Sequence, residues 1–391
     1  MRPRAERLLD AAPVIDGHND ILYELRDRFG GDFDRLDLAE RQPAVMTDIP
    51  RIREGRLGGQ FWSVYVPSDL PGHEAVTATL EQFDAFDAML ERYPSTFERV
   101  RTADDIERAT RAGRVASLAG VEGGHSIGCS MGVLRTFARL GAGYMTLTHN
   151  DTTPWADSAT DEPAHGGLTR FGEEVVREMN RLGVLVDLSH TSADTRRQAI
   201  EVSDAPVIFS HSNARALCDV SRNVPDDVLD LVGRTNGVVM VTFVPSFLTP
   251  EGADANRVAW EEARRLRELH EGDPAAARVA MEAWFDAQGE PPASVADVAD
   301  HIDHIRDVAG VDRIGIGGDL DGMPSTPAGL EDVSCYPNLF AELLERGYTE
   351  AHLEGIARGN ILRTLGHAER LRDRLRDERG PSLARIEDLD G

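Results

Sequence analysis

The sequence predicts an α/β protein that folds as a (β/α)8 barrel of the TIM type, with a helical insertion between the seventh and eighth strands. Three observations lead to this prediction. Eight short apolar runs rich in β-branched residues are spread over the 391 residues, segments with helical periodicity lie between them, and polar residues end six of the runs. Strand and helix therefore alternate, which is typical of a parallel barrel. An open, doubly wound sheet is the alternative architecture.

The expected strands are nearly continuous apolar runs, the pattern of strands that are buried on both faces of a parallel sheet. Turn residues bound each run, so each has a definite start and end. In chain order the runs are 14–20, 60–66, 115–122, 144–149, 184–190, 206–211, 238–244 and 314–319.

Helical periodicity fills the intervals between these runs. Leu80, Phe83 and Phe86, for example, follow one another at spacings of three, which places them on one face of a helix. The pattern is clearest at 80–93, 171–182 and 297–308.

The whole chain, 1–391, is expected to form a single catalytic barrel domain. Residues 32–55 are charged and weakly periodic, which indicates an insertion after the first strand. Residues 249–292 are rich in Ala, Glu and Arg and end in a Pro-Pro pair; we expect them to form a helical insertion over the barrel mouth. Residues 369–391 are charged and are expected to form a peripheral tail.

The charge balance argues against several classes of partner. With 42 basic and 68 acidic residues the net charge is −26, whereas nucleic acids and anionic membrane surfaces require basic patches. No stretch has the length and apolarity of a membrane span, and no secretory signal peptide is visible at the start of the sequence. We therefore expect neither a nucleic-acid partner nor a membrane partner.

Cysteine and lysine usage narrow the chemistry further. Cys129, Cys218 and Cys335 are too few and too scattered for a disulfide framework or a thiolate zinc site, which favours a reducing, cytoplasmic location. All 42 basic residues are arginine. The lack of lysine excludes a pyridoxal-phosphate Schiff base, a Walker A loop and a carboxylated lysine that bridges two metal ions.

Histidine and carboxylate side chains gather at the predicted strand ends. Because the carboxyl ends of barrel strands meet at one mouth, where active sites are built, these side chains should lie together. The residues concerned are His18, Asp20, Glu122, His149, His190, His211 and Asp319.

The types and spacing of these residues predict a metal centre. His18 and Asp20 are two residues apart, so both side chains leave the same face of their strand, and His190 and His211 end adjacent strands. Imidazole and carboxylate ligands suit Zn²⁺, and Mn²⁺ or Co²⁺ as well. Together with Glu122 they exceed the three protein ligands usual for one catalytic zinc. We therefore expect two ions, bridged by Glu122 because no lysine is available, that activate a bridging water.

The remaining polar residues near the mouth have candidate roles in binding and proton transfer. Asp319 could accept the proton of the attacking water and return it to the leaving amine, and Asp321 is a competing candidate. His149 could polarise a substrate carbonyl. Arg222 could bind a carboxylate through a two-pronged contact. The histidines in helices and other loops, His301 among them, are expected to be satisfied or solvated side chains.

Seven motifs in order give the chain a recognisable pattern. IDGHND, GVEGGHSIG, LTHND…PWADS, GVLVDLSHTS, PVIFSHSNARALC, RNVPDDVL and IGIGGDLDG resemble the renal (membrane) dipeptidase family of the amidohydrolase superfamily. The similarity extends from about residue 14 to about residue 366. The resemblance implies a (β/α)8 barrel with two zinc ions. In that pattern His18 and Asp20 match the ligands of the first ion, His190 and His211 match those of the second, and Glu122 matches the bridging carboxylate.

The resemblance also implies the reaction. Family members hydrolyse dipeptides to free amino acids, and the second residue can be D as well as L. His149 matches the substrate-binding histidine, Arg222 matches the arginine that holds the dipeptide carboxylate, and Asp319 matches the catalytic aspartate, which ranks it above Asp321. Small dipeptides are thus the expected substrates, and the family pattern allows a homodimer.

Other functions stay open at this point. No signal, anchor tail or cysteine pattern like that of the animal enzymes is visible in the sequence, so we do not expect membrane attachment to carry over. A lactonase, phosphotriesterase or deaminase could use the same barrel, because fold does not fix function. A binding protein that kept the barrel without catalysis is a third class, which the complete set of expected ligands disfavours.

Overall fold

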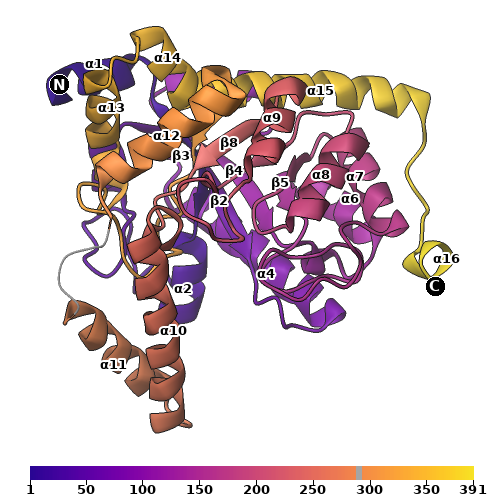
Figure 1. Cartoon of the computed structure of the whole chain (residues 1–391), viewed down its shortest axis with the longest axis horizontal. Helices are drawn as coiled ribbons and strands as arrows, with labels where there is room; N and C mark the ends of the chain where they lie inside the picture. The colour runs from indigo at the N-terminus through magenta and orange to yellow at the C-terminus, as the bar shows by residue number, and fades with distance from the viewer. Residues whose placement is uncertain (288–292) are drawn as a thin grey trace.

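Eight parallel strands close into a barrel, which confirms the predicted fold class (Figure 1). The computed structural model describes residues 1–287 and 293–391. Pairing of β2 with β4, in register from Gly59 opposite Ala116 to Tyr65 opposite Glu122, closes the ring. Its strands are β1 (Val14–Asn19), β2 (Leu57–Tyr65), β4 (Val115–Glu122), β5 (Ala142–Thr146), β6 (Leu185–Asp187), β7 (Ile208–Phe209), β8 (Val238–Val241) and β9 (Ile314–Ile316).

A ninth strand, β3 (Phe97–Arg99), was not predicted from the sequence. It lies outside the ring and pairs in parallel with the first half of β4, where Phe97 is opposite Val115. Its three residues include two charged ones, so it has neither the length nor the apolar character by which the other strands were found.

Helices surround the barrel and bury its outer face. Several begin with a Ser or Thr side chain that accepts a hydrogen bond from the first turn, as Thr169 does from Gly172 at α7. The described helices outside the insertion are α1 (Arg2–Ala11), α2 (Ile21–Phe29), α3 (Ile49–Gly55), α4 (Gly72–Arg92), α5 (Ala103–Arg111), α6 (Met131–Leu140), α7 (Arg170–Leu182), α8 (Ala193–Val202), α9 (Asp226–Thr235), α12 (Val295–Ala309), α13 (Tyr336–Glu345), α14 (Glu350–Glu354), α15 (Asn360–Glu378) and α16 (Ile386–Leu389).

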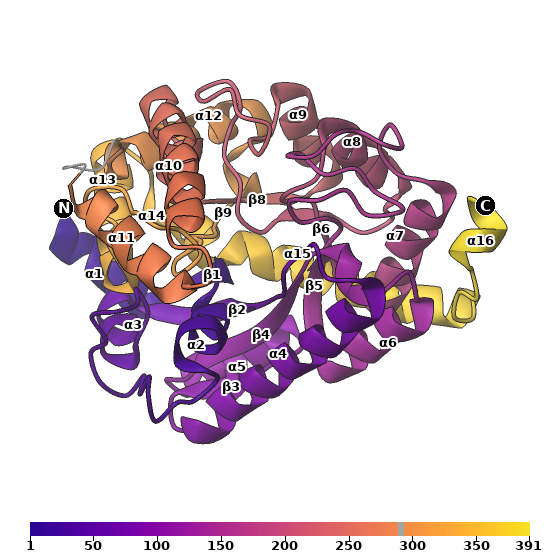
Figure 2. The same cartoon turned by 90° about the horizontal axis from the view of Figure 1, so that it is seen from below.

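Helix α15 covers the amino-terminal end of the barrel, which we call the barrel base. Its apolar side chains, Leu365 and Leu371 among them, form one buried cluster with inward-facing strand residues such as Ile15 and Leu118. In Figure 2 this helix crosses behind the strands. Residues 369–378, expected to begin a peripheral tail, are instead the last turns of α15. The charged sequence hid an apolar stripe, since Leu371 and Leu375 are spaced by one helical turn.

The predicted insertion between the seventh and eighth barrel strands contains two helices. They are α10 (Pro250–Leu269) and α11 (Pro274–Asp286), and they project from the end of the molecule opposite α15 (Figure 1). Residues 288–292, the last part of the expected insertion, lie outside the described residues. The insertion therefore lies at the end of the barrel where the strands have their carboxyl ends.

Candidate active site

All of the strand-end residues singled out in the sequence lie at the barrel mouth. His18 is in β1, Asp20 follows it directly, and Glu122 is the last residue of β4. The other strands end earlier than predicted, so the remaining residues lie in the loops just beyond them: His149 after β5, His190 after β6, His211 after β7 and Asp319 after β9.

Two of these loops leave the strand through an unusual backbone conformation. The φ angles of His190 and Asp319 are 64° and 62°, and that of Asp321 is 68°. Each such residue costs roughly 1–3 kcal/mol unless it is glycine, and residues of this kind concentrate at functional sites. The conformation ends the strand and turns the side chain into the mouth, which the apolar pattern of the strand could not reveal.

The loop that follows β9 requires glycine at position 322. A Cβ atom on Gly322 would lie 2.2 Å from Oδ2 of Asp20 and 2.6 Å from Oδ1 of Asp319. The backbone of Gly322 thus packs directly against two candidate site carboxylates.

The carboxylate of Glu122 lies at the centre of the group. Its Oε2 is 3.4 Å from Nε2 of His18, whereas its Oε1 is 3.1 Å from Nε2 of His190 and 3.7 Å from Nε2 of both His149 and His211. The two oxygens therefore face two different sets of side chains. A carboxylate placed in this way can bridge two cations.

The first set forms around His18. Its Nε2 is 3.2 Å from Oδ2 of Asp20 and 3.9 Å from Oδ1 of Asp319. Burial lowers the pKa of His18, but Tyr144, Glu122 and Asp20 outweigh burial and hold it well above its usual range. This imidazole therefore lies in a strongly negative environment that favours a positive charge.

The second set has the opposite character. Burial holds the pKa of His149, His190 and His211 well below the usual range, and the positive charge of Arg222 acts in the same direction on all three. Neutral imidazoles are the form that binds a metal ion. Burial also raises the pKa of Glu122, since taking a carboxylate out of water disfavours its charged form.

The side chains fit a cation centre. Nε2 of His18 is buried and has no hydrogen-bond partner among the described residues, and a bound cation would supply an interaction for this atom. Imidazole nitrogen and carboxylate oxygen are donors that suit Zn²⁺. Three sets each bring three ligand atoms within 4.8 Å of one another: His18, Glu122 and His211; Glu122, His149 and His190; and His18, Asp20 and Asp319.

Two hydrogen-bond chains orient the histidines, and sequence reasoning missed both. Nδ1 of His18 is 2.8 Å from the Tyr144 hydroxyl. Nδ1 of His211 is 2.8 Å from the Ser210 hydroxyl, which donates to Oδ2 of Asp187 at 2.7 Å. Such partners fix the ring orientation and leave Nε2 directed at the site. Asp187, in VLVDLSH, was hidden within a predicted apolar strand.

Asp16 joins two of the strands that carry the site. Its Oδ1 accepts hydrogen bonds from the backbone N–H of His18 at 2.8 Å and from Gln60. Its Oδ2 accepts from the backbone N–H of Gly318 and from the Tyr336 hydroxyl, both at 2.8 Å. The carboxylate therefore fixes the backbone next to His18 and next to Asp319.

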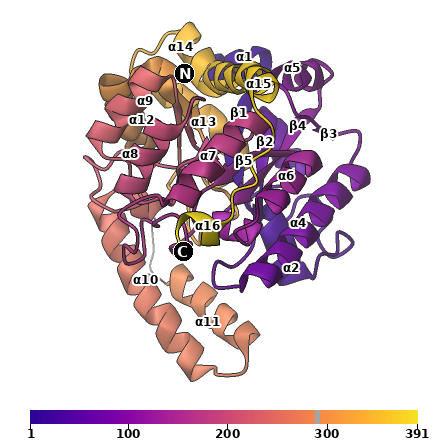
Figure 3. The ribbon, with the colours of Figure 1, turned by 90° about the vertical axis from the view of Figure 1, so that its right-hand side faces the viewer.

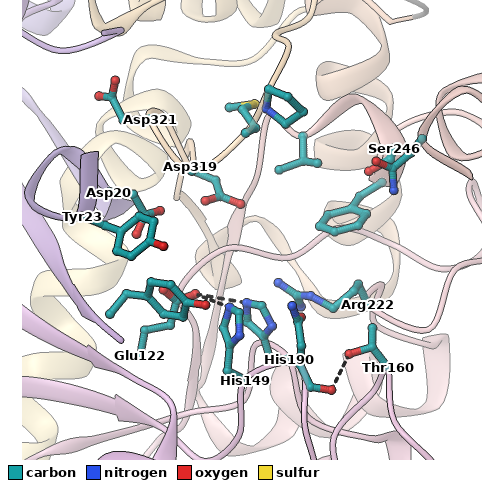
Figure 4. A pocket seen from close by; sticks show the side chains of 18 of the residues that line it. Asp20, Tyr23, Glu122, His149, Thr160, His190, Arg222, Ser246, Asp319 and Asp321 are labelled. Carbon is teal, nitrogen blue, oxygen red and sulfur yellow. Dashed lines mark hydrogen bonds and ion pairs between the residues drawn. The ribbon is translucent and has the colours of Figure 1, made fainter. Parts of the chain in front are cut away.

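A cavity of about 790 Å³ opens beside these groups, and the Arg222 side chain reaches into it next to His149 and His190 (Figure 4). The Arg222 side chain is 5% exposed and its guanidinium lies 5.2 Å above the Phe247 ring. Burial lowers its pKa to about 10, although Asp319 and Glu122 act in the opposite direction. Its Nη1 is buried without a hydrogen-bond partner among the described residues. A buried guanidinium with spare donors is suited to bind an anion in the cavity.

Aromatic side chains form part of the cavity wall, and these were not predicted. The Tyr65 ring packs against His149 with 4.6 Å between centroids, and Tyr23 packs against Tyr65 at 4.9 Å. Tyr65 ends β2, so the rule that found the other residues, polar side chains at strand ends, could have found it too. From the insertion, Asn256 reaches the wall.

The structure also separates the two candidate proton acceptors. Both carboxylates line the cavity, but Oδ1 of Asp319 lies 3.9 Å from Nε2 of His18. Burial raises the pKa of Asp319 well above the usual range, with His18 acting against the rise. Asp321 accepts a hydrogen bond from the backbone N–H of Met46 at 2.5 Å, and burial raises its pKa to about 6. Asp321 therefore helps to hold the loop before α3, and Asp319 is the carboxylate nearer to His18.

The sequence matches a known family over nearly its whole length. The profile of the membrane dipeptidases, peptidase family M19, covers residues 2–379. The chain belongs to the membrane dipeptidase family. It is accordingly a hydrolase of the metallopeptidase class, and its resemblance to this family, first drawn from seven motifs, is confirmed.

Individual relatives agree with this membership. Dipeptidase 3 of Mus musculus is 41% identical over 379 residues, which cover 96% of this chain and 68% of that protein. The probable dipeptidase PvdM from Pseudomonas aeruginosa has the same fold, with a TM-score of 0.80 at 24% identity over 95% of this chain and 98% of that one. A metallo peptidase from Rhodobacter sphaeroides, liganded with a phosphinate mimic of the dipeptide L-Ala-D-Ala, has a TM-score of 0.74 at 25% identity over 91% of this chain and 99% of that one.

Membership in the membrane dipeptidase family corrects one expectation. The prediction of a cytoplasmic location is wrong, because the family is described as membrane dipeptidases and its members include Dipeptidase 3. Among the described residues no helix is both long and apolar enough to cross a membrane. The physical reason for the error is that targeting and anchoring depend on segments separate from the barrel, so barrel sequence and cysteine usage do not decide location.

Proposed function

We propose that this membrane dipeptidase family member is a binuclear zinc dipeptidase that hydrolyses L-Xaa-L-Xaa and L-Xaa-D-Xaa dipeptides to free amino acids. The observation that carries the proposal is the position of Arg222. Its buried guanidinium, whose Nη1 has no hydrogen-bond partner among the described residues, faces the same cavity as the cluster around Glu122. A dipeptide bound between them would have its carboxylate on Arg222 and its peptide bond near the cluster.

The proposed ligands divide between two zinc ions. His18 and Asp20 would hold one, His190 and His211 the other, and Glu122 would bridge them with one oxygen toward each set. When bound, two zinc ions supply a water that is deprotonated near neutral pH and an electrophile for the peptide carbonyl. His149 lies as near to Glu122 as His211 does, but His149 lines the cavity and His211 is 1% exposed below it. This difference supports His149 as a substrate-binding residue.

Proton transfer is assigned to Asp319. Its carboxylate lines the cavity beside His18 and within the field of Arg222. A carboxyl group whose pKa is raised holds a proton more readily than an ordinary carboxylate and can pass it on within the site. Asp319 would take a proton from the attacking water and deliver it to the nitrogen of the leaving amino acid. His149 would donate to the carbonyl oxygen, where negative charge develops.

The proposal is tested with zinc-reconstituted protein and a panel of L-L and L-D dipeptides, each paired with its C-terminal amide. We expect cleavage of the free dipeptides, weak cleavage of the amides and two zinc ions per chain by elemental analysis. Arg222→Met should lower kcat/KM for free dipeptides by about 100-fold, since a charged hydrogen-bond pair is lost, and should change the amides little. Arg215→Met is the matched control, because Arg215 lies in the same loop but pairs with Asp219 at the surface.

Two results would contradict the proposal. If Arg222→Met lowered kcat/KM equally for dipeptides and for their amides, Arg222 would not be the residue that binds the substrate carboxylate. Two bound zinc ions without any dipeptide cleavage, together with turnover of lactones, phosphotriesters or nucleobases, would assign the same centre to another hydrolytic reaction.

A further inference from the structure

A second cavity, lined mainly by arginine, lies near the barrel base and away from the metal ligands. It has a volume of about 380 Å³ and forms between α6, α7, α15 and the segment between β3 and α5. Figure 3 faces this side, where the chain leaves α15, passes over α7 and ends at α16. We call the guanidinium groups lining it the arginine cluster: Arg101, Arg135, Arg139, Arg181 and Arg376.

Helix ends explain part of this clustering. Arg101 donates to the backbone carbonyl of Arg139 at 2.9 Å, near the end of α6, and Arg376 donates to the carbonyl of Arg181 at 3.3 Å, near the end of α7. Cations stabilise the carboxyl ends of helices, whose last carbonyls lack partners. Each of these contacts occupies only one or two of the five N–H donors of a guanidinium.

Carboxylates do not balance the cluster. Of the five guanidinium groups, Arg181 binds Glu178 through two hydrogen bonds of 2.7 and 2.8 Å, and Arg135 approaches the same carboxylate at 3.4 Å. Arg139 donates to the Thr136 hydroxyl instead. Among the described residues no carboxylate pairs with the side chains of Arg101, Arg139 or Arg376. Five positive groups thus share one negative partner in a chain whose net charge is −26.

We propose that the arginine cluster binds a small anion that carries two or more negative charges, of the phosphate class. The planar guanidinium matches the geometry of phosphate oxygens through paired N–H donors. Arg101, Arg139 and Arg376 are exposed, whereas Arg181 is buried and Arg135 half-buried, so the donors line a recess with a charged floor. Such a recess favours a compact ligand over the flat surface of another protein.

The cluster is distinct from the proposed catalytic site. Arg135, Arg139 and Arg181 lie in α6 and α7, before β5 and β6 begin, whereas His149 and His190 lie after those strands end. Binding there should therefore stabilise the protein without a change in dipeptide hydrolysis. The inference does not depend on the proposed function, and its failure would leave that function untouched.

The test is calorimetric titration of the zinc-loaded protein at low ionic strength with fructose 1,6-bisphosphate, inorganic phosphate and succinate. We expect the bisphosphate to bind more tightly than phosphate or the dicarboxylate, and binding to weaken with added salt. Arg139→Gln/Arg376→Gln should weaken it roughly 30- to 100-fold, because two charged donors are lost. Arg374→Gln is the matched control, since Arg374 lies on the same helix but pairs with Glu378; it should bind normally.

A parallel titration of Arg222→Met separates the two cavities. Bisphosphate binding that persists in Arg222→Met but weakens in the double variant, with kcat/KM of the double variant unchanged, supports the proposal. Equal binding by the double variant and the parent, or binding lost only in Arg222→Met, would overturn it. A dimer in sedimentation that dissociates in the double variant, without bisphosphate binding, would overturn it too and assign the cluster to contact between two copies.

Discussion

The two ends of the barrel are built from the same strands and have opposite character. In β1, Ile15 belongs to the apolar cluster under α15, whereas His18 reaches the mouth; in β4, Leu118 and Glu122 divide in the same way. At the base, buried apolar side chains of the strands and of α15 form one cluster. At the mouth, buried polar groups lie close to one another, and some of their atoms, such as Nε2 of His18, have no hydrogen-bond partner among the described residues.

This difference shows how one fold separates stability from chemistry. Burial of apolar area at the base stabilises the folded chain. The mouth works against stability, since it holds buried ionisable groups and left-handed residues such as His190 and Asp319. Substitutions at the base should therefore change stability and leave activity unchanged. Substitutions at the mouth should lower activity and leave stability largely unchanged.

The largest expected effect is at the mouth. Glu122→Gln removes a charge that two cations would share, so we expect kcat/KM for dipeptides to fall by at least about 1000-fold and the zinc content to drop. The unfolding free energy of the metal-free protein should not decrease, because a buried carboxylate is removed. Steady-state kinetics, elemental analysis and urea denaturation measure the three quantities.

Asp151→Asn is the control for this variant, since Asp151 lines the same cavity at its exposed rim. It should keep its zinc and most of its activity. A Glu122→Gln protein that binds two zinc ions and hydrolyses dipeptides at a tenth of the normal rate would show that this carboxylate is not needed to hold the metal centre at the mouth.

At the base, Leu365→Ala should lower the unfolding free energy by about 2–4 kcal/mol, because it leaves a cavity under α15. Dipeptide hydrolysis at 25 °C should be unchanged. Leu383→Ala is the matched control, because Leu383 is 84% exposed in the carboxy-terminal segment, and its loss should have no effect on stability. If Leu365→Ala lowered kcat with no loss of stability, the two ends of the barrel would be coupled.

His301 is a polar residue close to the mouth that we expect to contribute to stability and not to activity. Its Nδ1 accepts from the backbone N–H of Ala214 at 3.0 Å and its Nε2 donates to the carbonyl of Leu248 at 2.9 Å, so it joins α12 to two mouth loops in its neutral form. Burial lowers its pKa to about 4. Below about pH 6.5 the unfolded chain binds a proton that the folded chain does not accept until about pH 4, so stability falls as the pH decreases.

We expect this histidine to account for a loss of about 2 kcal/mol between pH 7.5 and pH 5. Urea denaturation at both pH values, on the parent and on His301→Gln, measures it. The variant should be less stable at pH 7.5 and should lose less on acidification. An identical pH dependence in both proteins would show that the acid sensitivity has another origin.

The smallest effect is expected from the insertion. Asn256→Ala should change the ratio of kcat/KM between two dipeptides that differ in one side chain by about 5-fold, since one neutral hydrogen-bonding group leaves the cavity wall. Asp254→Ala, on the exposed side of α10, is the control. Unchanged ratios across the dipeptide panel would mean that the insertion does not contribute to substrate preference.

Much of the fold and of the candidate site could be read from the sequence. The apolar runs marked all eight barrel strands because strands buried on both faces allow few polar residues. Because these runs contain few polar residues, His18, Glu122 and His190 stood out at the strand ends. The strand Phe97–Arg99 was not predicted because three residues are too few to show a periodic pattern. Asp187 was not singled out because one polar residue inside an apolar run does not by itself indicate a function.

Three features could be recognised from the sequence alone: the alternation of strand and helix, the absence of lysine, and the set of histidines and carboxylates available for a metal centre. These depend on local periodicity and on residue identity. Three other features became visible only in the folded molecule: the two oxygens of Glu122 face different ligand sets, the Arg222 side chain forms no ion pair with a carboxylate of the described residues, and five arginines from four separate segments share one cavity. Such features depend on distances between segments far apart in the chain, which packing of the whole barrel fixes.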